Sequence, residues 1–563
     1  MKLVECVPNF SEGRDRGVLD AITRAIEAVD GVRLLDVDPG AATHRTVVTF
    51  VGPPEAAAEA AFHAIRIAGE RIDMRQHRGE HARLGATDVC PFVPLAGATM
   101  QDCIELARAL GERVGRELEI PVYLYEEAAT RPERRNLATI RAGEYEGLAD
   151  KLRDPAWKPD FGPARFDAAR GATVIGARAF LVAYNINLNT RDKKLAQDIA
   201  LDLRESGRAE RDAKGVIVRD AAGKQVTRPG RFPHVKAVGW AIEEYGRAQI
   251  SINFTNTEVS PVHAVFDAAC LEADRRGLRV TGSELVGLVP LEVLLAAGRH
   301  FLRKQGKSAG APESELLHIA VRSLGLDELR PFVAAERVIE YRVRDAASSR
   351  LQSMSLLEFA DVLSTDAPAP GGGSVAALVG ALAAALAAMV ASLSHRADSP
   401  AELERLGLEA QATKAALLAS VDRDAASFDA VLAARRLPKA TGGGASARDA
   451  AVRAALRAAC TEPLAVAQAA ARAAEQARAA ATLGIAAARS DAGVAALCAA
   501  TAAEAALYNV LINLAELTDP ADADFVRTTR HAAQAACDAA HATANAVRAT
   551  VRGSLAGSPA PAP

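Results

Sequence analysis

The chain has 563 residues and a formal net charge of −3, and 50% of its residues are hydrophobic but only 4% aromatic. A chain of this length exceeds one ordinary hydrophobic core and predicts roughly three or four domains. The near-neutral charge, without a basic stripe interleaved with aromatic residues, gives no electrostatic footprint for nucleic acid. We therefore expect no nucleic-acid partner.

The seven cysteines are odd in number and scattered, and no two form a C-x-x-C pair. This pattern indicates neither a disulfide framework nor a zinc-cysteine site. The first residues run directly into a strand-like segment and lack the charged start, long apolar stretch and cleavage site of a signal peptide. Together these features predict a reduced, cytoplasmic protein.

Up to about residue 337, short β-type runs alternate with amphipathic helical patterns. The first series predicts strands at 3–7, 32–38, 46–50, 89–94 and 122–125, and helices at 19–29, 55–72 and 100–118. The second series predicts strands at 180–188, 235–242, 249–253 and 277–280, and helices at 195–204, 262–275 and 291–302. This order predicts two α+β subdomains of the split βαβ, ferredoxin-like type, each with helices on one sheet face.

Glycine and proline in 157–163 and 171–178 predict a loop at the junction of the two subdomains, where ligand sites commonly form. The charged, glycine-interrupted stretch 204–231 predicts a surface excursion, and 338–341 predicts a strand end. We expect subdomains at 1–179 and 180–337, a linker at 338–355, a helical domain at 356–552 and a disordered tail at 553–563.

From Leu356 alanine dominates and apolar residues recur at helical spacing, which predicts an all-α helical bundle. Ala-rich faces bury little area each, so we expect a homo-oligomer to complete the core. The uncharged run Val375–Leu393 is long enough to span a bilayer. It is mostly Ala and Gly and lacks Trp or Tyr anchors, which favours the centre of a bundle, so no membrane partner is expected.

The densest polar stretch is 77–92, in which His77, Glu80 and His81 spell the H-x-x-E-H pattern of one metalloprotease class. Gly79 weakens the helix that such ligands need, and the flanking arginines would repel a dication. A loop histidine at 81 beside Glu80 fits a general base, with arginines nearby for a carboxylate substrate. A histidine that caps a helix end is the structural alternative.

Asp36, Asp38 and Arg45 lie where one predicted strand ends and the next begins, so they can reach the same sheet edge. Exposed strand-end charges are the alternative interpretation for each of them.

Gly371, Gly372, Gly373 and Ser374 lead directly into the apolar helix of the second half. Successive glycines at a helix N-terminus expose backbone N–H groups and predict an anion cradle. The Lys-Ser/Thr of a P-loop is missing, and a linker-like turn would look similar.

Asp422 and Asp424 lie two residues apart in an Ala-rich helix, so they point apart and only one is expected to face the bundle interior. A carboxylate in a dry interior is costly unless paired, which makes it a candidate catalytic group. Two solvated acids are the alternative. Asp491 is a further polar group on an apolar helix, and Asn509 and Asn513 share a helix face.

The chain resembles the bifunctional formimidoyltransferase-cyclodeaminase family over nearly its whole length. The resemblance rests on Val4–Gly13, Gly79–His81 with Asp88–Phe92, Ile140–Glu146, Pro159–Pro163, Leu285–Pro290, Pro370–Ser374 and Asn509–Leu514. The chain departs from the family at Ala82, in place of a proline, and at His44, where an Asn is often found. It also has Ile485 where relatives have an Asn after the glycine.

The resemblance implies that the first half transfers the formimino group of N-formimino-L-glutamate to N5 of tetrahydrofolate. It implies that the helical half then closes the ring, which releases ammonia and forms 5,10-methenyltetrahydrofolate. Polyglutamylated tetrahydrofolate is the implied co-substrate, and the chemistry requires no metal.

The family's transferase histidine falls on His81, and its cyclodeaminase aspartate falls on the Asp422/Asp424 pair, with Asp422 favoured. Its folate-binding segment falls on about 161–170. The residues expected to bind substrate or folate are Asp38, Arg45, Glu80, Phe161, Gly162, Pro163, Arg165, Gly176, Gly371, Gly372, Gly373, Ser374, Asp424, Asp491, Asn509 and Asn513.

Three other hypotheses remain at the level of sequence. The first is an enzyme with transferase activity alone, whose helical half serves assembly. The second is an H-x-x-E-H metalloenzyme, and the third is a membrane-associated scaffold without activity, which would rest on Val375–Leu393.

Overall fold

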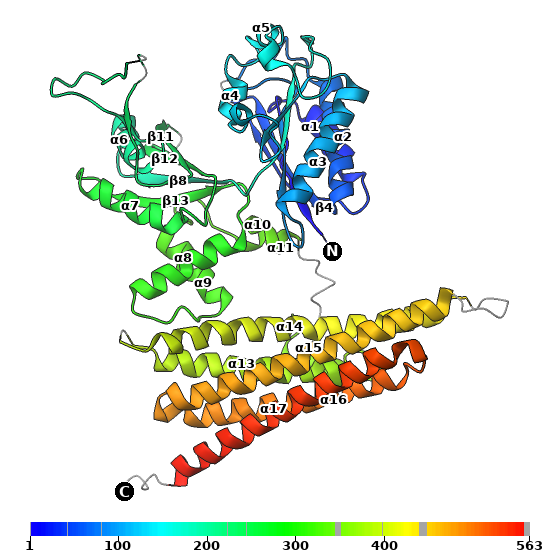
Figure 1. The fold of residues 1–563 in the computed structure, drawn as a ribbon. Helices are drawn as coiled ribbons and strands as arrows, with labels where there is room; N and C mark the ends of the chain where they lie inside the picture. The colour runs from blue at the N-terminus through cyan, green and yellow to red at the C-terminus, as the bar shows by residue number, and fades with distance from the viewer. Residues whose placement is uncertain are drawn as a thin grey trace. The chain divides into compact units, whose positions relative to one another are not determined.

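The computed structural model describes residues 2–41, 43–79, 82–221, 223, 225–243, 245–343, 351–396, 398–438 and 447–556. Contacts within the chain divide it into two units. The first comprises Met1–Val293 with Leu324–Val343, and the second Leu294–Ser323 with Arg344–Pro563. The first unit combines β-sheets with helices and the second is helical, as predicted (Figure 1).

The first lobe of the first unit is a sheet in the order β3-β4-β1/β2-β5-β7-β6. Its strands are β1 (Val4–Cys6), β2 (Asn9–Phe10), β3 (Arg33–Gly40), β4 (Arg45–Gly52), β5 (Thr87–Pro94), β6 (Val122–Glu126) and β7 (Thr173–Ala177). Pairing is antiparallel except at β5–β7 and β7–β6. Helices α1 (Arg16–Glu27), α2 (Pro54–Arg71) and α3 (Met100–Arg113) share one apolar core with the sheet, because residues such as Ile22, Ile65 and Leu110 pack against Phe50 and Phe92.

The second lobe is a four-stranded sheet in the order β11-β12-β8-β13. Its elements are β8 (Val182–Leu188), α6 (Lys193–Leu203), β11 (Val235–Ile242), β12 (Arg247–Phe254), α7 (Val262–Asp274) and β13 (Val280–Val286). Chain order here is β8-α6-β11-β12-α7-β13, which matches β1/β2-α1-β3-β4-α2-β5 of the first lobe. The two lobes therefore repeat one plan, and the first extends it with α3, β6 and β7.

Three expectations about local structure were wrong. Residues 171–178 are not a loop, because Thr173–Ala177 form β7, a buried parallel strand between β5 and β6. The strand expected at 277–280 starts only at Val280 and runs to Val286. The strand end expected at 338–341 is instead part of helix α11 (Ile339–Val343), which follows α10 (Ala334–Arg337). Glycine signals and short apolar runs misled the first two predictions, since tertiary pairing decides such segments.

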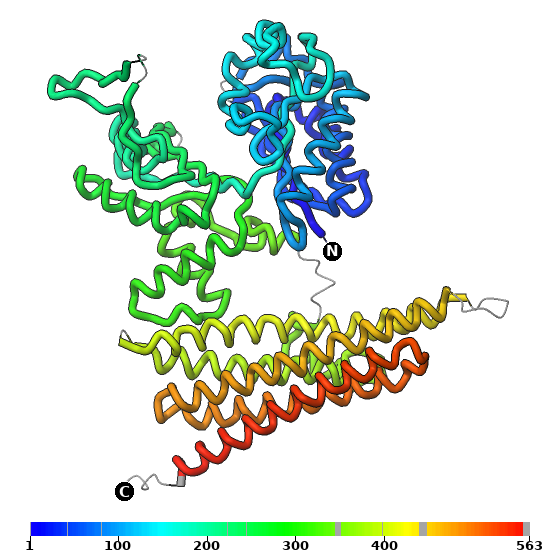
Figure 2. Tube along the Cα trace, in the orientation of Figure 1, coloured from blue at the N-terminus to red at the C-terminus, as the bar shows by residue number. Residues whose placement is uncertain are grey.

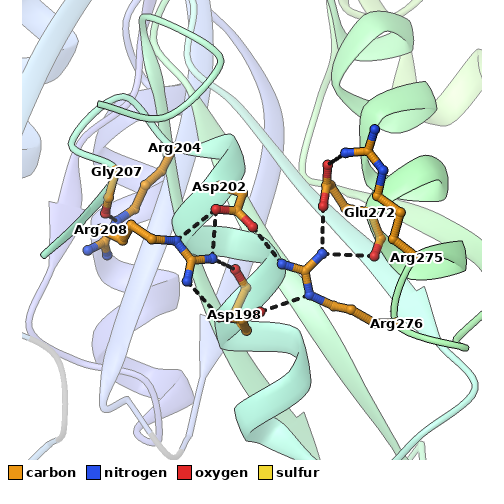
Figure 3. A network of polar contacts seen from close by, with 8 residues as sticks. All are labelled: Asp198, Asp202, Arg204, Gly207, Arg208, Glu272, Arg275 and Arg276. Carbon is orange, nitrogen blue, oxygen red and sulfur yellow. Dashed lines mark hydrogen bonds and ion pairs between the residues drawn. The ribbon is translucent and has the colours of Figure 1, made fainter. Parts of the chain in front are cut away.

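The excursion at 204–231 lies at the surface as predicted and carries a two-stranded ribbon of β9 (Arg208–Ala209) and β10 (Thr227–Arg228). A network of charges ties its base to the helices of the second lobe (Figure 3). Asp202 of α6 accepts hydrogen bonds from Arg208 of the ribbon at 2.8 Å and from Arg276, just beyond α7, at 2.6 Å. Asp198, one turn earlier, accepts from the same two guanidiniums at 3.0 and 2.8 Å.

The second unit is a bundle of long helices, as predicted. They are α13 (Gly372–Ser394), α14 (Ala401–Arg436), α15 (Ala447–Leu483), α16 (Arg489–Ala515) and α17 (Ala523–Ala556), preceded by α12 (Leu356–Leu363). Figure 2 shows these helices running lengthwise beside one another. Alanines fill the interfaces, for example Ala384, Ala473 and Ala503 in one buried cluster. The remaining helices are α4 (Leu137–Arg141), α5 (Leu148–Lys151), α8 (Leu291–Lys304) and α9 (Glu313–Leu324).

Two helical segments in the described part of the chain are long and apolar enough to cross a bilayer. They are Gly372–Ser394, with 61% of its most apolar window buried inside the protein, and Ala486–Ala515, with 50% buried. A core helix of a bundle meets the same criteria, so this composition is weak evidence for a membrane.

Candidate functional site

The predicted base His81 and its neighbour Glu80 lie outside the described residues, but the chain on both sides of them is described. Gly79 passes close to the β3–β4 turn, where a Cβ would lie 2.3 Å from the carbonyl oxygen of Thr43. A cavity of about 550 Å³ adjoins this point and is lined by Arg78, Gly79, Arg83, Gly143, Glu144 and Glu146. The polar loop predicted from the sequence therefore borders a cavity.

His77 is a structural residue in this loop. Arg83 Nε donates to His77 Nδ1 at 3.2 Å, and His77 Nε2 lies 2.8 Å from the carbonyl oxygen of His44. With Nδ1 accepting, Nε2 carries the hydrogen and donates. Burial lowers the pKa of His77, which keeps the ring neutral. Neither ring nitrogen has a lone pair left for a metal, so the H-x-x-E-H hypothesis loses its first ligand.

His44, a departure from the family pattern, stacks on His77 with ring centroids 4.4 Å apart. Its Nδ1 lies 3.1 Å from the carbonyl oxygen of Arg78 and its Nε2 lies 3.1 Å from the Glu12 carboxylate. Burial raises the pKa of Glu12. The backbone N–H groups of residues 13–15 and the charge of His44 outweigh the effect of burial, and the net shift of this pKa is downward. His44 thus links the 77–79 loop to the turn after β2.

Two guanidiniums and two carboxylates meet at the β3–β4 edge. The predicted proximity of Asp38 and Arg45 is confirmed, because β3 and β4 form a hairpin with Gly40 opposite Arg45. Burial lowers the pKa of Arg45 to about 10, the charges of Asp88 and Asp38 oppose this shift, and that of Arg141 adds to it. Arg141 is bonded to Asp88, which is almost fully buried.

Sequence reasoning missed four residues here: Asn9, Glu12, Asp88 and Arg141. Asn9 Oδ1 accepts from Arg45, and Asp88 Oδ1 also accepts from the backbone of Leu84 at 3.0 Å. All four lie in stretches that carry the family resemblance, and each is a polar residue in or beside an apolar run. Their position within these stretches is the feature of the sequence from which they could have been predicted.

Several residues expected to bind folate also have a role in the fold. Phe161 pairs with Val122 beside β6, and Gly162 has φ +79° with a Cβ position 2.3 Å from the carbonyl oxygen of Ile120. Gly176 lies in β7, where a Cβ would lie 2.3 Å from the ring of Tyr125. Pro163 is half-buried and Arg165 is exposed. Their folate contacts stay predictions.

In the helical unit, Asp424 of α14 lies at the N-terminus of α13. Ser374 Oγ lies 3.0 Å from Asp424 Oδ2, and the side chain and backbone of Ser374 both donate to this carboxylate. A Cβ on Gly373 would lie 2.0 Å from Asp424 Oδ1, so only glycine permits this approach. The predicted anion cradle is thus filled by the protein's own carboxylate.

Burial raises the pKa of Asp424, the hydrogen bonds from Ser374 lower it, and the charge of Glu462 raises it further, so the net shift is upward. Asn509 of α16 lies on the other side of the glycines, with its amide about 3.7 Å from the Cβ position of Gly372. The structure therefore brings together Gly372, Gly373, Ser374, Asp424 and Asn509. A carboxylate with a raised pKa, held by a hydroxyl, can move a proton.

The other predicted residues of this half lie elsewhere. Asp422, favoured from the sequence, accepts from the backbone N–H groups of Leu351 at 2.7 Å and Gln352 at 3.2 Å. Asn513 donates to the carbonyl oxygen of Ala459 at 2.8 Å. Asp491 lies at the far end of α16, roughly 27 Å from Asn509 along the helix. Gly371, which precedes α13, has no atom within 4 Å of its Cβ position.

Among the residues that the structure describes, no group of three or more His, Cys, Asp or Glu side chains is placed to hold a metal ion.

Comparisons with known proteins match most of the chain, in three consecutive segments. Residues 3–178 match the formiminotransferase domain, N-terminal subdomain; residues 183–344 the formiminotransferase domain; and residues 355–535 formiminotransferase-cyclodeaminase. The formimidoyltransferase-cyclodeaminase of Mus musculus is 44% identical over 92% of this chain and 93% of its own. The glutamate formimidoyltransferase of Streptococcus pyogenes serotype M1 is 41% identical over 54% of this chain and 94% of its own.

A solved structure of formiminotetrahydrofolate cyclodeaminase from Thermotoga maritima is 26% identical, covers 37% of this chain and 98% of its own, and superposes with a TM-score of 0.31. The resemblance drawn from the sequence motifs is confirmed by the family models and by the relatives that match along most of their length. The chain belongs to the formimidoyltransferase-cyclodeaminase family.

Proposed function

We propose that this protein is a bifunctional, folate-dependent enzyme of histidine degradation. It transfers the formimino group from N-formimino-L-glutamate to N5 of tetrahydrofolate and then cyclises the product to 5,10-methenyltetrahydrofolate with release of ammonia. The observation that carries the proposal is the match of one chain to both formiminotransferase domains and to the cyclodeaminase domain. The alignment also covers 93% of a relative whose name states both activities.

In the transfer step, N5 of tetrahydrofolate attacks the formimino carbon and loses its proton. The bond from that carbon to the glutamate nitrogen breaks, and this nitrogen gains a proton. His81 is the proposed base and then acid. Arg45 and Arg141 lie close enough for each charge to disfavour the other, so a substrate carboxylate between them would relieve that repulsion.

In the cyclisation step, N10 attacks the carbon of the protonated formimino group and gives up its proton. The former imino nitrogen gains that proton and leaves as ammonia, and the cationic methenyl bridge remains. Asp424 is the proposed carrier of this proton, in place of Asp422. Its position beside Ser374 at the start of α13 and its raised pKa support this choice.

We further propose finer features. Both lobes are assigned the ferredoxin-like type, which their βαββαβ chain order supports. Tetrahydrofolate is proposed to act in its polyglutamylated form, without a metal, because side chains suffice for each proton transfer. The absence of cysteine pairs in the sequence supports a cytoplasmic location.

A homo-oligomer is also proposed, and exposed apolar side chains on two helices of the bundle support it. On α13 these are Leu382, Met389 and Leu393, and on α16 they are Val494, Leu497, Tyr508 and Ile512. A face of this kind is typical of a subunit interface. Light scattering of the purified protein tests the proposal, and a monomeric mass at micromolar concentration would refute it.

The main proposal is tested by supplying N-formimino-L-glutamate and tetrahydrofolate to the purified protein. Ammonia release together with the absorbance of the methenyl product is expected. Accumulation of 5-formiminotetrahydrofolate without ammonia would instead support the transferase-only hypothesis. No turnover of either kind would reject both.

A further inference from the structure

The second lobe has a sheet face that the proposed function leaves unused. Strand β8 alternates, so that Tyr184 and Ile186 lie in the apolar core while Asn185 and Asn187 face the other way. Strand register places Asn185 opposite Ser251 of β12 and Glu284 of β13. A polar row therefore crosses the face of the sheet opposite the core.

Glu284 is the anomaly on this face, because it is a carboxylate with only 7% of its surface exposed. Its Oε1 accepts from Asn185 Nδ2 at 2.9 Å and from Gln249 Nε2 at 3.0 Å. Both donors are neutral amides, and within the described part of the chain no cation forms an ion pair with it. A buried charge held without a counter-charge is costly and is typical of a ligand site.

The surrounding hydrogen bonds fix which oxygen is left over. Gln249 Nε2 also donates to Asn187 Oδ1 at 2.7 Å, and Gln249 Oε1 accepts from Trp240 Nε1 at 3.0 Å. These bonds orient the amide so that it can only donate to Glu284. Glu284 Oε2 is the acceptor that remains. It is not one of the buried atoms that lack a partner, so it is open to solvent or to a ligand.

The rim of this face suits a flat ligand. Trp240 is 40% exposed, Val238 is exposed beside it on β11, and Val286 is exposed on β13 at the opposite edge of the sheet. Burial raises the pKa of Glu126 at the end of β6, and the charge of Lys236, on the same face of β11, opposes this shift. The face is therefore turned toward the first lobe. A ligand on this face would thus lie between an aromatic ring and a carboxylate.

We propose that Glu284 Oε2 accepts a hydrogen bond from an amidine-type N–H group of a substrate, with Trp240 as the apolar wall of the subsite. This inference rests on the proposed function and assigns it a recognition residue. Two sources carry an N–C–N group with N–H donors: the aminopyrimidine edge of the folate pterin and the formimino group of formiminoglutamate. A carboxylate accepts well from either because the bond is charge-assisted.

Calorimetric titration tests the proposal with three probes: folic acid, N-formimino-L-glutamate and p-aminobenzoylglutamate, which lacks the pterin. Glu284→Ala is expected to weaken binding of folic acid or formiminoglutamate roughly 10- to 100-fold, the value of a hydrogen bond to a charged group. The probe whose Kd moves identifies the source. p-Aminobenzoylglutamate should bind as it does to wild type.

Glu284→Gln is the second variant, since it keeps an acceptor for both amides and so preserves the fold, but replaces Oε2 with a donor. It should weaken the same probe. Glu328→Gln is the matched control, because this carboxylate on the same lobe accepts from Asn187 at 2.6 Å and is paired with Arg247. It should leave all three Kd values unchanged.

Unchanged binding of every probe in both folded Glu284 variants would overturn the inference, as would equal loss of all three probes. Wild-type turnover is measured in parallel. If the wild-type protein does not convert N-formimino-L-glutamate and tetrahydrofolate, the proposed function fails. If it does and the Glu284 variants bind normally, only this inference fails.

Discussion

At the scale of the residue, two aspartates two positions apart in α14 have unlike environments. Asp422 is solvated in part and accepts from backbone N–H groups at residues 351 and 352. Asp424 is half-buried at the start of α13, where partial burial beside Ser374 raises its pKa. The helical period turns the two side chains apart, so one stabilises the chain leading into the bundle and the other is available for chemistry.

Asp424→Asn is expected to slow ring closure of supplied 5-formiminotetrahydrofolate by roughly 10²- to 10⁴-fold, because an amide cannot carry the proton. Asp422→Asn is the matched control. It should keep ring closure and lower the free energy of unfolding by about 1–2 kcal/mol, since two N–H groups lose a charged acceptor. Loss of closure in the Asp422 variant with retention in the Asp424 variant would contradict the assignment.

Glu5 of β1 gives a pH-dependent prediction. Burial raises its pKa to about 7, the charge of Arg178 opposes this and that of Glu340 adds to it. A carboxyl whose pKa is raised on folding contributes stability that is present below its unfolded pKa and is lost as the pH rises through about 7. Glu5→Gln should therefore stabilise the protein at pH near 8 by up to roughly 3 kcal/mol, and little at pH near 5.

Thermal unfolding of both proteins across this pH range measures the effect, with Glu27→Gln, at an exposed position of α1, as the control. A stability difference between Glu5→Gln and wild type that does not change with pH would refute the role of burial.

At the scale of the element, the start of α13 depends on glycine for a steric reason. The Cβ of an alanine at 373 would overlap Asp424 Oδ1, at 2.0 Å. Gly373→Ala should therefore displace the carboxylate and reduce ring closure at least about 10-fold while leaving formimino transfer intact, as both assays on one protein would show. Wild-type rates of ring closure in this variant would mean that the position of Asp424 is not critical.

The ribbon of the excursion depends on the shared carboxylates of α6 (Figure 3). Asp202→Asn removes an acceptor used by both Arg208 and Arg276, and the side chain is partly exposed, so a loss of about 1 kcal/mol is expected. Hydrogen exchange at 208–228 should rise roughly fivefold, with Lys194→Gln on the same helix as the control. Exchange that rises equally across the second lobe would indicate general unfolding instead.

At the scale of the whole molecule, two unlike units carry the two proposed steps. His81→Ala should abolish transfer and spare closure of supplied 5-formiminotetrahydrofolate, and Asp424→Asn should do the reverse. A mixture of the two variants should then form methenyltetrahydrofolate after a lag, because the intermediate must cross the solution. If either substitution removed both activities from a folded protein, the two-site proposal would fail.

Much of the fold could be predicted because its signals are local. Apolar spacing predicted most elements of the two lobes within a few residues, among them α2, β5 and α7, and the change to alanine marked the bundle. β7 was missed because Gly171 and Gly176 resemble turn signals, although Gly176 is present to make room for Tyr125. The excess of polar residues at 77–92 predicted a site, but Asn9, Glu12 and Arg141 reach it only through the fold.

The sequence by itself determined the family and the two classes of structure, because motifs and periodicity are properties of the chain. It also predicted chemistry near 77–92, 371–374 and 422–424. Only the tertiary structure showed that Asp422 and Asp424 have different hydrogen-bond partners, gave both nitrogens of His77 a structural role and left Glu284 without a counter-charge. Those outcomes depend on which distant side chains meet and on how much water remains between them, and neither quantity is written in local sequence.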